Sequence, residues 1–153
     1  KILPVPREGA WMDPGPLGTL GVGMPFALAA QIAHPKKRVV IMYGDGSFGL
    51  NGFEYDTAVR FGLPIIGVMG NDAAWGQMMR PQGAVYGWDR LAATELTYTR
   101  YDKVVEALGG HGEYCERPEE IRPALDRAAA SGKPALVNIK IRQDKEYKGG
   151  IYV

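Results

Sequence analysis

Two acidic residues directly follow two apolar runs of this chain. Asp45 lies between glycines at the end of "RVVIMYG", residues 38–44, and Asp72 follows the next run, "PIIGVMG", residues 64–70. Glycines beside an acid let a ligand approach the backbone and allow successive amides to face an anion. The acid would repel that anion unless a divalent cation lay between them. Mg2+ takes oxygen ligands and bridges carboxylates to phosphates, so the pattern predicts a magnesium–phosphate site.

A single Gly-Asp-Gly is usually only a turn, so the prediction depends on where the two acids lie in the fold. Apolar, β-branched runs predict buried interior strands at 38–44, 64–70 and 135–141, and "GEYCE" a shorter strand at 112–116. Alternation of these strands with helices predicts an α/β domain around a parallel sheet. Ligands of such sheets bind beyond the carboxyl ends of the strands, where both acids would lie.

Four helices and one further short helix are expected between and before these strands. One lies within 20–33, and one begins near Asn51 with Glu54 completing a capping box. A third covers 101–108, with Thr99 and Asp102 as a second capping box, and the last begins at Pro118. "AAWGQMM" opens a short helix, and the segment "RPQGAVYGWDRLAATEL", residues 80–96, is predicted to be an irregular lid.

The stretch "GDGSFGLNGFEYDTAVRFGLPIIGVMGND", residues 44–72, resembles the cofactor motif of enzymes that depend on thiamine diphosphate. The resemblance implies a three-layer α/β/α domain with a mainly parallel central sheet. It also implies that Mg2+ is held by the side chains of Asp45 and Asp72 and by the backbone carbonyl of Ala74. Many members have asparagine where this chain has Asp72, so the site carries an additional negative charge. The resemblance implies that Gly46 and Ser47 contact the cofactor's diphosphate. The cofactor-binding residues that it implies in this part of the chain are Gly44, Asp45, Gly46, Ser47, Asp72, Trp75 and Gly76.

Two further segments extend the resemblance over nearly the whole chain. "GPLGTLGVGMPFALAAQIAHP" is similar to the glycine-rich segment of acetolactate synthase and its relatives. The resemblance implies that the Leu20 side chain wedges between the two rings of the cofactor. It also implies that the carbonyl of Gly18 and the amide of Leu20 contact the aminopyrimidine, and that Thr19 between them belongs to the cofactor site. The order GxxGxG after a loop makes a dinucleotide fingerprint the weaker interpretation. Residues 99–141 resemble the closing half of the domain in 2-hydroxyacyl-CoA lyases and oxalyl-CoA decarboxylase.

The resemblance implies an enzyme that cleaves or forms C–C bonds beside a carbonyl, with decarboxylation of a 2-oxo acid or an oxalyl-CoA-type substrate as the alternative. The activating glutamate of the family lies on a pyrimidine-binding domain. We expect that domain and the central domain to be absent from residues 1–153, which form a single diphosphate-binding domain. The missing domain would come from the same or another subunit of a homo-oligomer. A nucleotide-binding dehydrogenase and a non-catalytic scaffold are the interpretations from other classes.

Composition narrows the class of partner. The chain has 153 residues and a net charge of +1, without a block of like charge, which argues against nucleic acid. A small acyl or 2-oxo-acid substrate is expected, with a CoA thioester as one option, and Arg80 is either its anion contact or a solvated side chain. Cys115 is the single cysteine, which fits a cytoplasmic location and a small core residue. No run reaches the roughly 20 apolar residues that span a bilayer.

Overall fold

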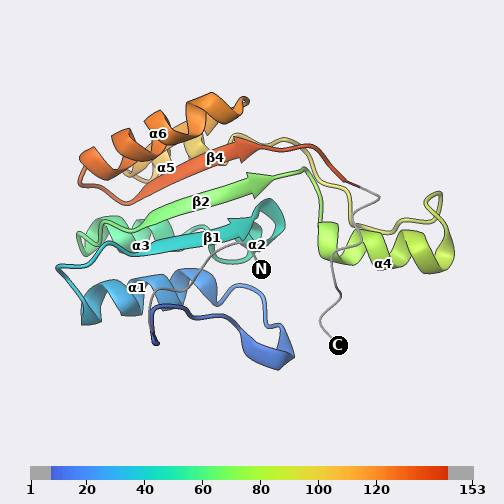
Figure 1. Ribbon diagram of the computed structural model, residues 1–153, viewed down its shortest axis with the longest axis horizontal. Helices are drawn as coiled ribbons and strands as arrows, with labels where there is room; N and C mark the ends of the chain where they lie inside the picture. The colour runs from blue at the N-terminus through green and yellow to red at the C-terminus, as the bar shows by residue number, and fades with distance from the viewer. Residues whose placement is uncertain (1–7, 145–153) are drawn as a thin grey trace.

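The computed structural model describes residues 8–144, so the outer parts of the predicted domain, 1–7 and 145–153, lie outside the described residues. Four parallel strands form one sheet in the order β1-β2-β4-β3 (Figure 1). They are β1 Val40–Gly44, β2 Ile66–Asn71, β3 His111–Cys115 and β4 Ala135–Lys140. The predicted α/β class and its parallel sheet are therefore confirmed.

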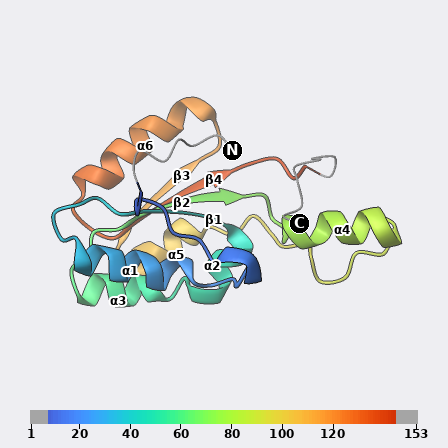
Figure 2. The same ribbon diagram turned by 60° about the horizontal axis from the view of Figure 1, so that its bottom comes forward.

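Helices cover both faces of this sheet and give the three layers. Those on one face are α1, α2, α3 and α5, and α6 lies on the other (Figure 2). The helix α4 lies beyond the carboxyl ends of the strands, beside the point where β2 ends (Figure 1). The helices are η1 Gly15–Leu17, α1 Gly23–Ala33, α2 Asp45–Asn51, α3 Glu54–Arg60, α4 Gly76–Tyr86, α5 Tyr101–Ala107 and α6 Pro118–Ala130. No helix among residues 8–144 is long and apolar enough to cross a membrane.

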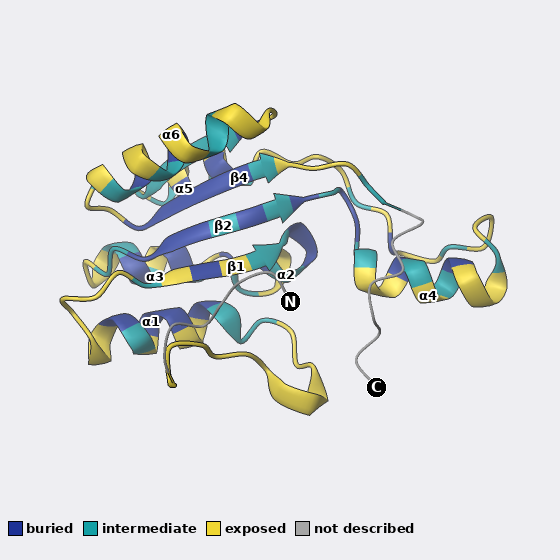
Figure 3. Ribbon diagram, in the orientation of Figure 1, coloured by how far each residue is buried: buried dark blue, intermediate teal, exposed yellow. Residues whose placement is uncertain are grey.

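Two apolar clusters hold the layers together, and alternate residues of each strand supply them. On β2, Met69 faces the cluster under α1, α3 and α5, whereas Ile66 faces the cluster under α6. Strand residues that alternate between the faces are what a sheet covered on both sides requires. Figure 3 shows that the buried residues concentrate on β2 and β4. Cys115 belongs to the second cluster, as the sequence predicted for a small core residue.

The prediction that β1 is an interior strand is wrong for the part of the chain described. β1 is an edge strand that pairs only with β2. Ile41 and Tyr43 pack under α1, but Val40 and Met42 point to the other face and are 51% and 56% exposed. The cause is that α6 packs over β3 and β4 and does not reach β1. An apolar run predicts a strand that tends to be buried, but the tertiary arrangement decides whether both of its faces are covered.

Both predicted capping boxes are wrong. α2 begins at Asp45, immediately after β1, and α3 begins at Glu54 without a side-chain cap. The helix after Thr99 also has no side-chain cap, because the Asp102 carboxylate accepts hydrogen bonds from Arg100 and Asn138 instead. The segment 80–96 is only partly irregular, since α4 continues to Tyr86. For Asp102 local spacing could not show the bond from Asn138, which lies 36 residues further along the chain.

Candidate active site

Asp45 is the first residue of α2 and lies at the carboxyl end of β1. Its side chain is 1% exposed, and neither carboxylate oxygen has a hydrogen-bond partner among the described residues. A buried carboxylate without partners is costly, because it loses water and gains no compensating bond. The two Asp45 oxygens therefore indicate a binding partner from outside the protein, such as a cation.

Asp72 leaves the neighbouring strand at the same edge of the sheet. Gly44 of β1 lies opposite Gly70 of β2, so the two acids project from adjoining strand ends. Burial, and then the negative charge of Asp72, raises the pKa of Asp45 from 3.8 to about 6. Burial also raises the pKa of Asp72, although the positive charge of Arg80 opposes this shift. Burial and the charge of Asp72 hinder the ionisation of Asp45, and burial hinders that of Asp72, so a cation would favour the charged form of both residues, and they fit Mg2+.

The turn that carries Asp72 is bound to a distant segment of the chain. Ala74 forms an isolated antiparallel bridge with Glu95, and the Trp75 amide donates to the carbonyl of Thr94 at 2.8 Å. The Leu96 amide donates to the carbonyl of Ala73 at 2.7 Å. Ala73 adopts a φ of 55°, a conformation that is uncommon for any residue except glycine. These bonds fix the backbone on both sides of Ala74.

Two of the predicted cofactor glycines lie close to the protein's own side chains. A Cβ atom on Gly46 would lie 2.7 Å from the Trp75 ring, so glycine there lets α2 pack against the residue that precedes α4. A Cβ atom on Gly76 would lie 3.0 Å from Oδ2 of Asp72. Gly44, by contrast, would meet only the carbonyl of Gly70, at 3.8 Å. The structure thus brings Gly46, Trp75, Gly76 and the two acids into one cluster.

The glycine-rich loop lies beside the carboxyl end of α2. Gly18 has a φ of 58° and ends η1, and a Cβ atom on Gly21 would collide with the Asn51 side chain. In Figure 1 η1 lies away from α2, and the loop that follows it returns toward α2 before α1 begins. Thr19 is exposed and Leu20 is 44% exposed, at the end of the sheet where Asp45 lies. Their contact with a cofactor remains a prediction, as does that of the partly exposed Ser47.

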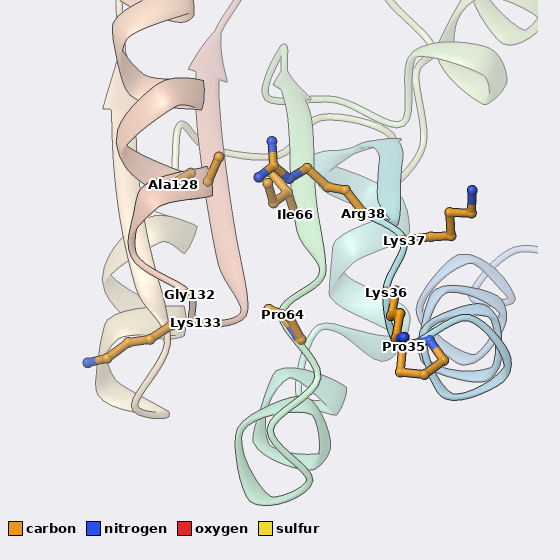
Figure 4. A pocket seen from close by; sticks show the side chains of 10 residues that line it. Pro35, Lys36, Lys37, Arg38, Pro64, Ile66, Ala128, Gly132 and Lys133 are labelled. Carbon is orange, nitrogen blue, oxygen red and sulfur yellow. The ribbon is translucent and has the colours of Figure 1, made fainter.

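Two hollows lie at opposite ends of the sheet. One, of about 490 Å³, lies beside the Asp72 turn and is lined by Asp72, Ala73, Glu95, Leu96, Thr97, Tyr98 and Gln143. The other, of about 270 Å³, lies at the amino ends of the strands between Pro35, Pro64 and Ala128 (Figure 4). In Figure 4 Arg38 reaches toward Ile66, whereas Lys37 and Lys133 extend away. Ligands of parallel sheets bind at the carboxyl end, which favours the Asp72 side.

Within residues 8–144 no group of three or more His, Cys, Asp and Glu side chains is arranged to hold a metal ion. A cation at this site would therefore depend on two carboxylates and on backbone or cofactor oxygens. That set of ligands suits Mg2+, which is commonly bound by one or two carboxylates plus phosphate.

Sequence reasoning missed Asn138 and the supporting role that it shares with Asn71 and Asp102 beneath the Asp72 turn. Asn71, Asn138 and Asp102 are buried and hydrogen-bonded to one another. A polar residue in the middle of an apolar strand run, such as the asparagine of "ALVNIKI", is the signal that could have identified them. Arg80 is a predicted anion contact, and its positive charge opposes the rise that burial causes in the pKa of Asp72.

Comparison with known proteins agrees with this geometry. The family model described as "Thiamine pyrophosphate enzyme, C-terminal TPP binding domain" matches residues 1–139. A protein from Mycobacterium bovis described as a probable acetolactate synthase is 50% identical over 131 residues, which are 86% of this chain and 24% of that protein. The 2-hydroxyacyl-CoA lyase 2 of Caenorhabditis elegans is 44% identical over 149 residues, covering 94% of this chain and 23% of that protein.

A solved structure has the same fold. The thiamine diphosphate-dependent 4-hydroxybenzoylformate decarboxylase of Rhodococcus jostii RHA1 superposes with a TM-score of 0.77 at 23% identity, over 85% of this chain and 24% of that one. The chain thus spans about a quarter of the length of the relatives it matches.

Proposed function

Because the chain belongs to the thiamine pyrophosphate enzyme family and carries its C-terminal TPP-binding domain, we propose that Asp45 and Asp72 hold the Mg2+ ion that anchors the cofactor's diphosphate. The observation that carries this proposal is the pair of buried Asp45 oxygens without hydrogen-bond partners, beside a second carboxylate. The carbonyl of Ala74, held in the same turn, is the third protein ligand. The carboxylates attract the cation by their negative charge, and burial strengthens this attraction because water is excluded.

The remaining predicted residues would orient the cofactor around this ion. Gly44, Gly46 and Ser47 lie at the start of α2, where backbone amides face a diphosphate favourably. Trp75 and Gly76 begin the next helix and lie beside the metal turn. Gly18, Thr19 and Leu20 would support the cofactor's rings from the loop before α1. When bound, the cofactor supplies an electron sink for bonds beside a carbonyl.

The names of the relatives support a reaction that forms or cleaves C–C bonds beside a carbonyl. Acetolactate synthase and 2-hydroxyacyl-CoA lyase are the two activities that those names give. We therefore propose an acyl or 2-oxo-acid substrate, either free or as a CoA thioester, with decarboxylation as the alternative. Family membership replaces the dinucleotide-binding dehydrogenase interpretation.

The proposed functional unit is larger than this domain. The relatives are about four times as long, and a pyrimidine-binding domain of the same or another subunit would complete the site. A homo-oligomer provides that second subunit. The buried, unpaired thiol of Cys115 is compatible with a cytoplasmic location.

Metal binding separates this proposal from the scaffold interpretation. We expect the purified protein to bind Mn2+, detected by electron paramagnetic resonance, and Mg2+ to displace it. Asp45→Asn should weaken Mn2+ binding by about tenfold or more, because one of two charged ligands is lost. Asp126→Asn is the matched control, since Asp126 is exposed on α6 and pairs with Arg122. If Asp45→Asn bound Mn2+ as tightly as the control, the assigned site would be wrong, and a scaffold would bind no ion in either variant.

Thermal unfolding provides the second measurement. Thiamine diphosphate with Mg2+ should raise the melting temperature of the control and leave that of Asp45→Asn unchanged, because ligands stabilise only the state that binds them. Turnover assays with pyruvate and with 2-hydroxyacyl-CoA thioesters then distinguish the two activities that the relatives' names suggest.

A further inference from the structure

Three polar side chains are buried together between the sheet and α5. They are Asn71 of β2, Asn138 of β4 and Asp102 of α5, and each is at most 1% exposed. Nδ2 of Asn71 donates to Oδ1 of Asn138 at 3.2 Å, and Nδ2 of Asn138 donates to Oδ1 of Asp102 at 3.1 Å. Buried polar groups are tolerated only when hydrogen-bonded, and here every amide atom is used.

The carbonyl of Thr99 accepts the remaining hydrogen of each amide. Asn71 donates to it at 3.1 Å and Asn138 at 3.2 Å. Thr99 therefore connects the segment that pairs with the metal turn to both β2 and β4. The two asparagines form a single unit with this carbonyl.

The direction of this chain of hydrogen bonds is fixed by its ends. At one end the Ala73 amide, which can only donate, binds Oδ1 of Asn71 at 3.2 Å. At the other end the Asp102 carboxylate accepts three bonds from the Arg100 guanidinium, at 2.9, 3.2 and 2.6 Å. Burial would raise the pKa of Asp102, but the Arg100 hydrogen bonds and charge hold it below the usual value, so the carboxylate only accepts. Exchanging the oxygen and nitrogen positions of either amide would therefore place donors against donors and acceptors against acceptors.

The bond from the Ala73 amide to Asn71 encloses Asp72. An asparagine that accepts a bond from the amide two residues later forms an Asx turn, which sets the backbone of the residue between them. Here that residue is the proposed metal ligand Asp72, and Ala73 follows it with a φ of 55°. Arg100 also stacks on Tyr114 of β3, 4.1 Å from the ring centre, which anchors the far end of the network.

We infer that Asn138 is a positioning residue for metal binding: acting through Asn71, it fixes the turn that presents the Asp72 carboxylate and the Ala74 carbonyl. The inference rests on the proposed function, because it supposes that this turn binds the ion. Asn138 lies on β4, whereas the proposed metal ligands follow β1 and β2. Its effect on the ion site therefore passes through its hydrogen bond with Asn71. Asp102 takes the same role one bond further away.

The test compares Asn138→Ala with Val137→Ala in the purified protein. Val137 is the preceding residue on β4, is fully buried, and faces the opposite cluster under α6. Both substitutions should lower the melting temperature. Asn138→Ala should in addition weaken Mn2+ binding by about tenfold or more, as removal of groups that orient metal ligands generally does. Val137→Ala should leave Mn2+ affinity within about twofold, because its cluster does not touch the turn.

A shape-conserving variant protects the test against misfolding. Asp102→Asn keeps the volume of the side chain but loses the charge that Arg100 binds, and should weaken Mn2+ binding about threefold or more. The inference would be overturned if Asn138→Ala bound Mn2+ as tightly as the unchanged protein. If Asn138→Ala does not fold, the same comparison is made with Asp102→Asn. If the unchanged protein bound no Mn2+, the proposed function would fail instead, so the two failures are distinguishable.

Discussion

At the scale of single residues, Asp45 is the most informative side chain of this domain. Its burial without hydrogen-bond partners destabilises the protein that lacks an ion, and the same property favours a cation when one arrives. Binding sites often store such a local cost, which the ligand then removes. The pH dependence of stability should reveal it.

The stability of the metal-free protein should depend on pH because Asp45 titrates. The pKa of Asp45 is raised from 3.8 to about 6 in the folded protein, so the folded state binds the proton more tightly than the unfolded state. The stability that this group contributes at low pH is therefore lost as the pH rises through about 6. Without metal, we expect the free energy of unfolding to fall by roughly 1 to 1.5 kcal/mol between about pH 5 and about pH 7.5.

Asp45→Asn should remove most of this slope and make the metal-free protein more stable near neutral pH, although it abolishes the gain from Mg2+. The raised pKa of Asp72 contributes in the same direction. Carboxyls with lowered pKa values, such as Glu113, lose their stabilising effect only below this pH window. Urea unfolding with a chelator at both pH values measures the effect, and an unchanged slope in Asp45→Asn would show that Asp45 does not cause it.

At the scale of elements, the contact between α2 and the start of α4 assembles the site. Gly46 in the first turn of α2 faces the Trp75 ring, which precedes α4. Asp45 and the Asp72 turn lie on either side of this contact. The packing of two short helices therefore determines how the carboxylates approach each other.

We predict that Gly46→Ala destabilises the protein by about 1–3 kcal/mol, because the new methyl group would lie 2.7 Å from the Trp75 ring. Gly49→Ala in the same helix is the matched control. A Cβ atom there meets nothing within 4 Å, so the change should stabilise α2 by about 0.5–1 kcal/mol.

Chemical denaturation compares the two variants, and the double variant with Trp75→Ala identifies the cause. Removing the ring should lessen the cost of Gly46→Ala, since the collision is then absent. Equal stability of Gly46→Ala and Gly49→Ala would show that α2 moves freely away from Trp75.

At the scale of the whole molecule, the two faces of the sheet are covered unequally. Among residues 8–144, the helices α1, α2, α3 and α5 cover one face, while α6 alone covers β3 and β4 on the other (Figure 2). β1 is left at the edge with Val40 and Met42 exposed. An exposed apolar edge strand is a site of self-association.

We therefore predict that Met42→Lys reduces self-association of the isolated chain and changes its stability by less than about 0.5 kcal/mol. The added charge lies on an exposed position and disfavours pairing between edges. Ala130→Lys, an exposed position on α6, is the control and should leave association unchanged. Light scattering over a range of concentrations measures the effect, and equal scattering from the two variants would contradict the prediction.

The sequence by itself determined the class of the fold and the family. Apolar runs, the glycines around Asp45 and the position of Asp72 are local features, and a residue's neighbours along the chain are enough to interpret them. For the same reason the strands were located correctly, whereas the capping boxes at Glu54 and Asp102 were not. Asp102 is bound by Asn138 from another part of the fold, which local spacing cannot show, and the helix expected near Asn51 is replaced by α2, which begins earlier, and by α3.

Only the tertiary structure decided which residues meet. Within residues 8–144 it placed β1 at an edge, set Gly46 against Trp75, left both Asp45 oxygens without hydrogen-bond partners and joined Asn138 to the Asp72 turn through Asn71. Each of these facts depends on contacts between segments far apart in the chain. Burial and hydrogen bonding are properties of the packed molecule, so the energy of the site arises only when strands and helices come together.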